Sequence, residues 1–297
     1  MDKRTLALFA AFIATFIYGF NFTIAKSIMP LHIKPFGFIL LRVVGASVLF
    51  WVFSIFYKNE KVAIKDWPRF IGVAVFGMAA NMLSFFTGLD YTTPINSAVI
   101  MTSSPILVLV LSALIIKEKI TWLKSSGVFI GLIGTLVLIF YGADPNQDAT
   151  NITLGNFLVF VNAACYGLYL ILVKPLTEKY HTFTILKWAF LLGVFINLPF
   201  TFNEFFAVDW LNLPATVLLA MVFVVVGTTF LTYLLNVYAL NELKASTLSV
   251  FIYLQPLVAT IFAVLVGSDS LSFIKMIAAL LIFSGVYLVT KRPKEPV

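Results

Sequence analysis

The run LALFAAFIATFIYGFNFTIAKSI occupies residues 6–28 and decides the structural class of the protein. Its side chains are almost all apolar, and Lys26 is the only charged residue in it. About 20 such residues in a helix cross the roughly 30 Å of hydrocarbon in a bilayer. The run is too long for the apolar part of a cleavable signal peptide and lacks a small-residue cleavage site. Residues 6–28 are therefore predicted to form a transmembrane helix.

The composition of the whole chain agrees with this prediction. Of its 297 residues, 61% are hydrophobic and 11% are charged, whereas about 25% are charged in an ordinary soluble domain. The 31 phenylalanines cannot all be hidden inside one water-soluble globule of this size. The same numbers exclude a disordered chain. The sequence is that of an integral membrane protein.

Ten apolar stretches are long enough to cross a bilayer, and short connections with turn-forming residues separate them. We therefore expect an all-α integral membrane protein of ten transmembrane helices. The predicted spans are 6–28, 36–56, 68–88, 95–116, 121–141, 152–173, 184–206, 214–237, 246–267 and 271–290.

The distribution of Lys and Arg predicts the orientation of these spans. Fifteen of these cations fall on the side that holds the N-terminus, and three, Lys26, Lys34 and Lys275, fall on the opposite side. Cytoplasmic loops of membrane proteins carry the excess of positive charge. We expect a multi-pass protein of the cell membrane with both termini in the cytoplasm.

The two halves of the chain resemble each other. A shift of 148 residues aligns Tyr18-Gly19 with Tyr166-Gly167, and a shift of 151 aligns Pro105 with Pro256. We divide the chain into a first five-helix repeat (1–143), an external linker (144–151) and a second repeat with a short cytoplasmic tail (152–297). Because five is an odd number, the second repeat enters the membrane from the other face. Inverted repeats around a central cavity are typical of secondary transporters, although a duplication could also merely enlarge a scaffold.

The two prolines that the repeat aligns lie near the middle of predicted spans. Proline removes one helical hydrogen bond and clashes with the carbonyl four residues earlier. Matched interruptions in two halves indicate a transport site, and the alternative is an ordinary kink. We predict that Pro105 and Pro256 act as hinges.

Polar side chains within the spans follow helical stripes, for example Asn162, Tyr166 and Tyr169 in the sixth span. Such groups are costly beside lipid, so we expect them to face the protein interior. For a single Asn or Thr a helix–helix hydrogen bond is the simpler explanation, and only the stripes taken together favour a pocket. Arg42 could bind a carboxylate, extend outward to the membrane surface, or pair with a carbonyl or a helix end as a structural contact. The predicted substrate-binding residues are Tyr18, Asn21, Arg42, Asn81, Phe85, Tyr166, Tyr169, Tyr233, Asn236, Tyr253 and Gln255.

Several of these residues match a known family. The run Tyr18-Gly19-Phe20-Asn21-Phe22 resembles the aromatic-Gly-x-Asn-Phe signature of EamA-type members of the drug/metabolite transporter superfamily. Arg42 lies where that family has an Arg in its second helix. The end of the first half is similar as well, in Ser104-Pro105, Lys117-Glu118-Lys119, Gly127, Gly131 and Gly134. The resemblance extends over nearly the whole chain.

This resemblance implies a fold of ten helices in two inverted halves and an activity of exporting or exchanging amino acids, drugs and other small metabolites. The sequence departs from the family near the end, where Gln255-Pro256 replaces Glu-Pro and Ser268-Asp269 replaces Gly-Glu. An ion-coupling role of that family glutamate therefore cannot be carried over to this chain.

Taken together, these features predict a secondary transporter of small metabolites such as amino acids or amphiphilic drugs, working by alternating access. A polytopic enzyme or a channel is the alternative, but neither GxSxG nor HExxH occurs in the sequence. We expect no enzymatic activity, no cofactor, no metal and no nucleic acid. The expected partners are the substrate and membrane lipid. The glycine-rich face of Gly127-x-x-x-Gly131, with Gly134, is expected to pack closely either within the bundle or against a second copy in a homodimer.

Overall fold

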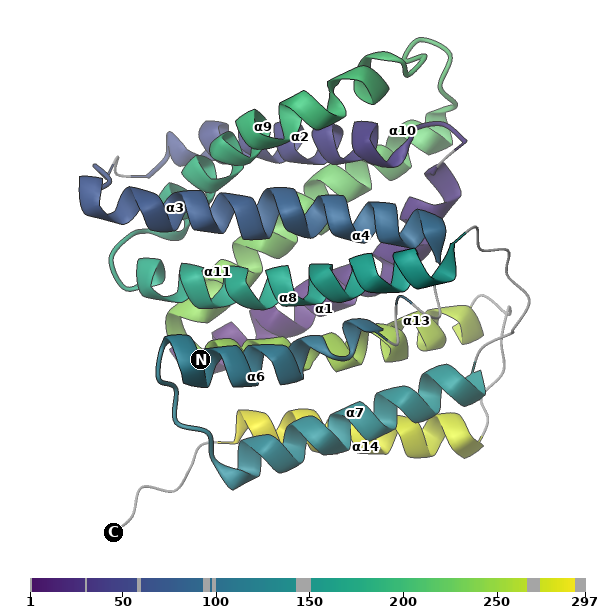
Figure 1. Cartoon of the computed structure of the whole chain (residues 1–297). Coiled ribbons are helices and arrows are strands. Elements are labelled where there is room, and N and C mark those ends of the chain that lie inside the picture. Colours follow the sequence, from purple (N-terminus) through teal and green to yellow (C-terminus); the bar gives the residue numbers. More distant parts are fainter. Residues whose placement is uncertain are drawn as a thin grey trace.

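The computed structural model describes residues 2–29, 31–57, 60–92, 97, 100–142, 151–265 and 273–291. Within these residues the chain is helical and has no β-strand. The helices run back and forth between two ends of one bundle (Figure 1). The uninterrupted α-helices of at least 18 residues are α1 (Lys3–Ile28), α2 (Pro35–Ser54), α7 (Trp122–Gly142), α8 (Ile152–Thr177), α9 (Thr182–Phe206) and α14 (Phe273–Thr290).

Other predicted spans are built from several shorter pieces. The third begins with the 3₁₀ turn η1 (Ile64–Asp66) and runs through α3 (Trp67–Ala74), the π-helix η2 (Val75–Ala79) and α4 (Ala80–Tyr91). The eighth joins α10 (Ala215–Val222), the π-helix η3 (Phe223–Leu231) and α11 (Thr232–Glu242). The ninth joins α12 (Ala245–Ser249), the 3₁₀ segment η4 (Val250–Tyr253) and α13 (Leu254–Leu265), and the fourth holds α6 (Ser104–Ile115).

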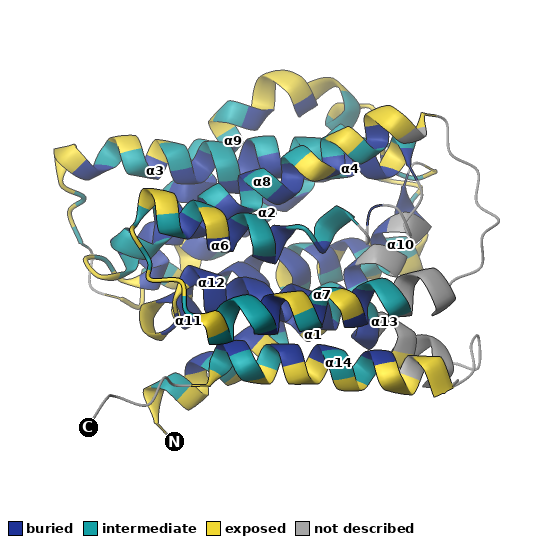
Figure 2. Ribbon diagram, turned by 60° about the horizontal axis from the view of Figure 1, so that its bottom comes forward, coloured by how far each residue is buried: buried dark blue, intermediate teal, exposed yellow. Residues whose placement is uncertain are grey.

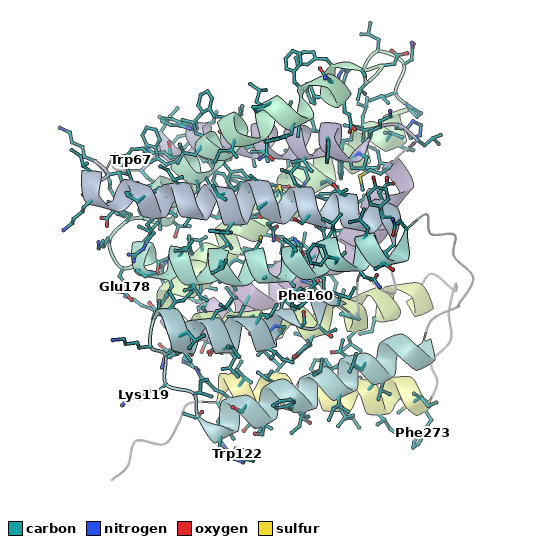
Figure 3. All side chains as sticks on the ribbon, viewed as in Figure 1. Trp67, Lys119, Trp122, Phe160, Glu178 and Phe273 are labelled. Atoms are coloured by element: carbon teal, nitrogen blue, oxygen red, sulfur yellow. The ribbon has the colours of Figure 1, made fainter. Side chains whose placement is uncertain are left out.

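Length and hydropathy indicate a multi-pass membrane protein. Six helical stretches of the described chain are long and apolar enough to cross a bilayer, and four shorter apolar helices accompany them. Many large apolar side chains are exposed on the outside of the bundle, among them Phe157, Phe160 and Phe283. Figures 2 and 3 show such exposed positions along the outer helices, with Phe160 labelled. In water this surface would be costly, whereas in lipid it is the favourable one.

Helices from distant parts of the chain lie side by side. The closest pairs are α7 with α14, α2 with α9, α4 with α8, and α1 with α11. The beginning of α1 and the end of α14 meet at one end of the bundle, where the Arg4 guanidinium donates to the Thr290 carbonyl. The same end carries Lys119, Trp122 and Glu178, while Phe273 lies at the opposite end (Figure 3).

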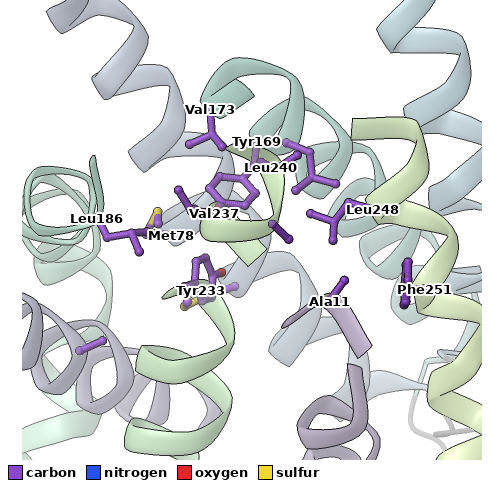
Figure 4. Packing of buried hydrophobic residues seen from close by; sticks show 14 of the residues in the cluster. Ala11, Met78, Tyr169, Val173, Leu186, Tyr233, Val237, Leu240, Leu248 and Phe251 are labelled. Carbon is purple, nitrogen blue, oxygen red and sulfur yellow. The ribbon is translucent and has the colours of Figure 1, made fainter. Parts of the chain in front are cut away.

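The interior combines apolar packing with a few polar bonds. Tyr169, Tyr233, Val237 and Met78 belong to one buried cluster at the centre of the bundle (Figure 4). At the end far from the termini, Glu204 of α9 accepts hydrogen bonds from the first amides of α2, at Phe36 (2.8 Å) and Gly37 (3.2 Å). A carboxylate in this position satisfies free amides and favours the positive end of the helix dipole. Glu204 thus fixes α2 against α9.

Candidate functional site

A cavity lies in the middle of the bundle between helices of both halves of the chain. It encloses about 640 Å³ of atom-free space, part of it open to solvent. The described residues that line it are Tyr18 and Asn21 of α1, Arg42 of α2, Asn81, Met82, Phe85 and Phe86 of α4, Met101, Asn162 and Tyr166 of α8, Tyr233 of α11, Ile252 of η4 and Gln255 of α13.

The wall between α4 and α8 is held by a reciprocal pair of asparagines. The Asn162 amide donates to the Asn81 carbonyl at 2.8 Å, and the Asn81 amide donates to the Asn162 carbonyl at 3.3 Å. Both side chains are buried. Each asparagine therefore uses its amide nitrogen to join the two helices, which leaves its side-chain oxygen as the atom for other contacts. In Asn162 that oxygen is buried and has no hydrogen-bond partner among the residues that the structure describes.

Next to this wall, backbone carbonyls of the two π-helices accept hydrogen bonds from side chains. A π-turn widens the helix by one residue and occurs mostly as a single local bulge, often at functional sites. In η2, the Gly77 carbonyl accepts a hydrogen bond from the Tyr233 hydroxyl at 2.9 Å, and the Met78 carbonyl accepts one from Asn197 at 3.0 Å. The bond to Gly77 positions the Tyr233 ring at the cavity.

The second π-helix holds the one charged group among the described lining residues. The Arg42 Nε donates to the Thr229 hydroxyl at 2.9 Å, and Nη2 donates to the Thr228 carbonyl at 3.4 Å. The guanidinium also lies 4.9 Å from the centre of the Phe86 ring. Arg42 is 5% exposed, so it does not extend to a membrane surface. It is a buried cation fixed at the cavity wall.

Both hinge prolines lie where a helix is interrupted. Pro105 is in the first turn of α6, a position that needs no amide donor, and the chain before it forms a turn at Thr102 and Ser103. Pro256 is in the first turn of α13, directly after the 3₁₀ segment η4. Each proline therefore follows a break in its span, and its role as a hinge stays a prediction. Met101 and Ile252, four residues before the two prolines, both line the cavity.

Comparison with known proteins accounts for this architecture. The model of the EamA-like transporter family matches the chain twice, over residues 5–140 and 153–291. The chain belongs to the EamA-like transporter family. The starts of the two matches are 148 residues apart (153 − 5), and so are the starts of the two π-helices (223 − 75). Membership of the family confirms the resemblance seen in the sequence.

Relatives and a solved structure resemble the chain over most of its length. The uncharacterized transporter YyaM of Bacillus subtilis (strain 168) is 27% identical over 90% of this chain and 88% of its own. An uncharacterized transporter of Archaeoglobus fulgidus is 28% identical over 93% of this chain and 95% of its own. One crystal structure covers 96% of this chain and 97% of its own with a TM-score of 0.77 at 18% identity, which shows a common fold.

Eight of the eleven substrate-binding residues that the sequence predicts for this EamA-like protein line the central cavity. They are Tyr18, Asn21, Arg42, Asn81, Phe85, Tyr166, Tyr233 and Gln255. The structure therefore gathers residues from α1, α2, α4, α8, α11 and α13 around one space.

The other three lie away from the described lining. Tyr169 is one turn beyond Tyr166 and packs behind the wall, 5.7 Å from the Tyr233 ring and against Gly77. Asn236 is likewise one turn beyond Tyr233 and is buried. Tyr253 is fully buried against Gly131 of α7. Its neighbour Ile252 lines the cavity instead, because consecutive residues of a 3₁₀ segment point about 120° apart.

Sequence reasoning missed five lining residues. Four of them, Met82, Phe86, Met101 and Ile252, are apolar and give no signal in an apolar span. The fifth, Asn162, was part of the predicted polar stripe with Tyr166 but was not included among the predicted substrate-binding residues.

The glycine-rich face of α7 packs within the chain. A side chain at Gly127 would meet Val289 and Gly285 of α14, and one at Gly131 would lie 2.5 Å from the Tyr253 ring. Gly134 is similarly close to Leu281. This face is already occupied by the protein's own helices, so a homodimer would have to use another surface.

Proposed function

We propose that this EamA-like protein is a secondary transporter that exports or exchanges small metabolites, such as amino acids or amphiphilic drugs, across the cell membrane. One observation carries the proposal: a single cavity is lined by residues of both family-matched segments. A site shared by two inverted five-helix halves can be opened first to one side and then to the other.

The chemistry of the cavity suits a small amphiphilic ligand. Phe85, Phe86 and three tyrosines, Tyr18, Tyr166 and Tyr233, supply large aromatic surfaces, and Asn21 and Gln255 add groups that can form hydrogen bonds. Aromatic walls with a few polar groups are typical of sites for small organic molecules. A sugar phosphate would need several buried cations, and Arg42 alone among the described lining residues is charged.

The position of the cavity suggests which side is open. With both termini in the cytoplasm, α1 ends and α2 begins at the external side, and Asn21 and Arg42 each lie seven residues from that end (28 − 21 and 42 − 35). At the cytoplasmic end, the two halves are joined, because Lys124 of the first half and Ser246 of the second both bind Glu118. We infer an outward-facing state that is closed toward the cytoplasm.

Counterflow in proteoliposomes tests the function. Vesicles with the purified protein are loaded with an unlabelled ligand, found by a thermal-shift screen of amino acids and amphiphilic drugs, and uptake of the labelled ligand is followed. A transporter with alternating access accumulates the label transiently, whereas a channel does not. Tyr166→Ala should weaken binding by about 1–3 kcal/mol, the scale of a lost buried aromatic contact.

Phe160→Ala is the matched control. Phe160 is on the same helix α8 but faces outward, with 45% of its surface exposed, so its loss should leave binding and exchange unchanged. The absence of counterflow, or equal effects of the two substitutions, would reject the cavity as a transport site.

A further inference from the structure

The connection between α6 and α7 turns its acid inward and its lysines outward. The Glu118 side chain is 5% exposed and binds Lys124 and Ser246. Its two sequence neighbours, Lys117 and Lys119, are exposed. Lys117 has a left-handed backbone with φ 53°, a conformation that is unfavourable for a residue with a side chain. This turn buries the negative charge and leaves two positive charges at the surface.

The connection between α2 and α3 has the same arrangement. Its two acids bind the connection between α8 and α9: Glu60 accepts from the His181 amide, and Asp66 accepts from the Tyr180 hydroxyl, both at 2.8 Å. The lysines next to these acids are exposed, namely Lys61 and Lys65. The two ion pairs within the described residues use other lysines, Lys124 and Lys179. The four exposed lysines thus have no carboxylate partner in the described part of the chain.

Large apolar side chains are exposed beside both pairs of lysines. Ile64, directly before Lys65, is 88% exposed, and Trp122, three residues after Lys119, is 86% exposed. Figure 3 shows Trp67, Lys119 and Trp122 at the end of the bundle that holds the termini. At a membrane surface, apolar side chains enter the boundary of the acyl chains while lysines stay at the headgroups. Tryptophan is enriched at this depth.

The described lysine at the opposite end has different surroundings. Lys34 is exposed, but it lines a hollow together with Glu204 and Asp209. The positive charge there lies close to negative charge of the protein itself. An uncompensated basic surface is therefore a property of the two connections at the end with the termini, and a negatively charged partner complements it.

We propose that the α2–α3 and α6–α7 connections form a binding surface for anionic phospholipids, whose phosphates contact Lys61, Lys65, Lys117 and Lys119. The neighbouring Ile64 and Trp122 favour a lipid over a soluble acidic protein, because a lipid supplies acyl chains as well as negative charge. This surface lies outside the central cavity, and the inference does not depend on what the protein transports.

The test is scanning fluorimetry of the full chain in a neutral detergent, titrated with short-chain lipids. Dioctanoyl-phosphatidylglycerol should raise the melting temperature, because a ligand that binds only the folded state stabilises it. Dioctanoyl-phosphatidylcholine and glycerol 3-phosphate, which lack the net charge or the acyl chains, should have little effect. Added salt should weaken the response to phosphatidylglycerol.

Two double variants remove one lysine pair each. Lys61→Gln with Lys65→Gln, and Lys117→Gly with Lys119→Gln, should each weaken the affinity for phosphatidylglycerol by about 25-fold, or about fivefold for each lysine. The lysines are exposed, and glycine relieves the left-handed strain at Lys117, so both variants should fold. Lys34→Gln is the matched control, an exposed lysine at the other end, and should leave the response unchanged.

Equal stabilisation by phosphatidylcholine and phosphatidylglycerol would overturn the proposal, and so would double variants that respond like the unmodified protein. A loss in Lys34→Gln as large as that of a lysine pair would show a general effect of charge and would also overturn it. Stabilisation by polyglutamate without stabilisation by phosphatidylglycerol would assign the surface to an acidic protein, and an equal response to glycerol 3-phosphate would assign it to free phosphate. None of these results bears on counterflow, which tests the transport function separately.

Discussion

The reciprocal asparagine pair between α4 and α8 permits a quantitative test of the cavity wall. Asn162 donates to the Asn81 carbonyl at 2.8 Å, and Asn81 donates to the Asn162 carbonyl at 3.3 Å. Each side chain binds the backbone of the other residue. Alanine at one position therefore removes one bond and leaves both atoms of the other bond in place.

The geometry sets the size of the two effects. Side-chain hydrogen bonds in a membrane protein contribute about 0.6 kcal/mol on average and up to about 1.7. The 2.8 Å bond has the better length, so Asn162→Ala should destabilise by about 1–1.7 kcal/mol and Asn81→Ala by about 0.5. Because neither substitution removes an atom of the other bond, the double variant should cost more than either single variant. The two residues are in contact, so the double variant can depart from the sum by about 0.5 kcal/mol or more.

Unfolding of the purified protein by SDS titration, with scanning fluorimetry as a second measurement, gives the four free energies of this cycle. Asn162→Leu, which keeps the branched shape and the number of side-chain heavy atoms although its methyl groups are bulkier, leaves no cavity and so helps to separate the loss of the bond from the effect of a cavity. The reasoning is refuted if Asn81→Ala costs more than Asn162→Ala. It is also refuted if the double variant costs no more than one single variant, because the bonds would then not be independent.

Three other outcomes follow from the structure. Gly131→Leu should strongly reduce the folded yield, measured by gel filtration, because even a Cβ at Gly131 would lie 2.5 Å from the Tyr253 ring; a normal yield would contradict the packing of α7. Glu118→Gln should lower the melting temperature, since Lys124 loses its ion pair, but leave exchange measurable; abolished exchange in a folded variant would point to proton coupling. Cysteines at Lys61 and Asn146, in a Cys165→Ser background, should label from opposite sides of the membrane, and labelling from one side would overturn the ten-span topology.

Hydropathy and helical periodicity predict the straight parts of this protein well. The class of the fold and the inward position of Tyr18 and Asn21 on α1 both follow from the high free energy of polar groups in lipid. This cost applies to any regular helix in the membrane. The same reasoning placed Asn81, Phe85 and Tyr166 on the inner faces of α4 and α8, where the structure has them.

Periodicity fails where the helix is no longer an α-helix. Tyr253 was predicted to face the cavity from a helical pattern that assumes a turn of about 100° per residue. The segment η4 turns by about 120° per residue instead. Over the four residues of Val250–Tyr253 the accumulated difference in side-chain direction exceeds half the width of a helix face. Ile252 points to the cavity instead. The apolar residues of the lining are invisible for another reason: in a chain that is 61% hydrophobic, one more Met or Phe carries no information about which face is buried.

The π-helices are the part of the site that no pattern in the sequence predicts, and they determine its chemistry. A regular α-helix satisfies each interior carbonyl with its own amide, so it has little to offer a buried guanidinium. In η3 the Thr228 carbonyl accepts from both Arg42 and the Thr232 hydroxyl, while the Thr229 hydroxyl donates to the Val224 carbonyl and accepts from Arg42. These neutral acceptors hold the cation in place without neutralising it.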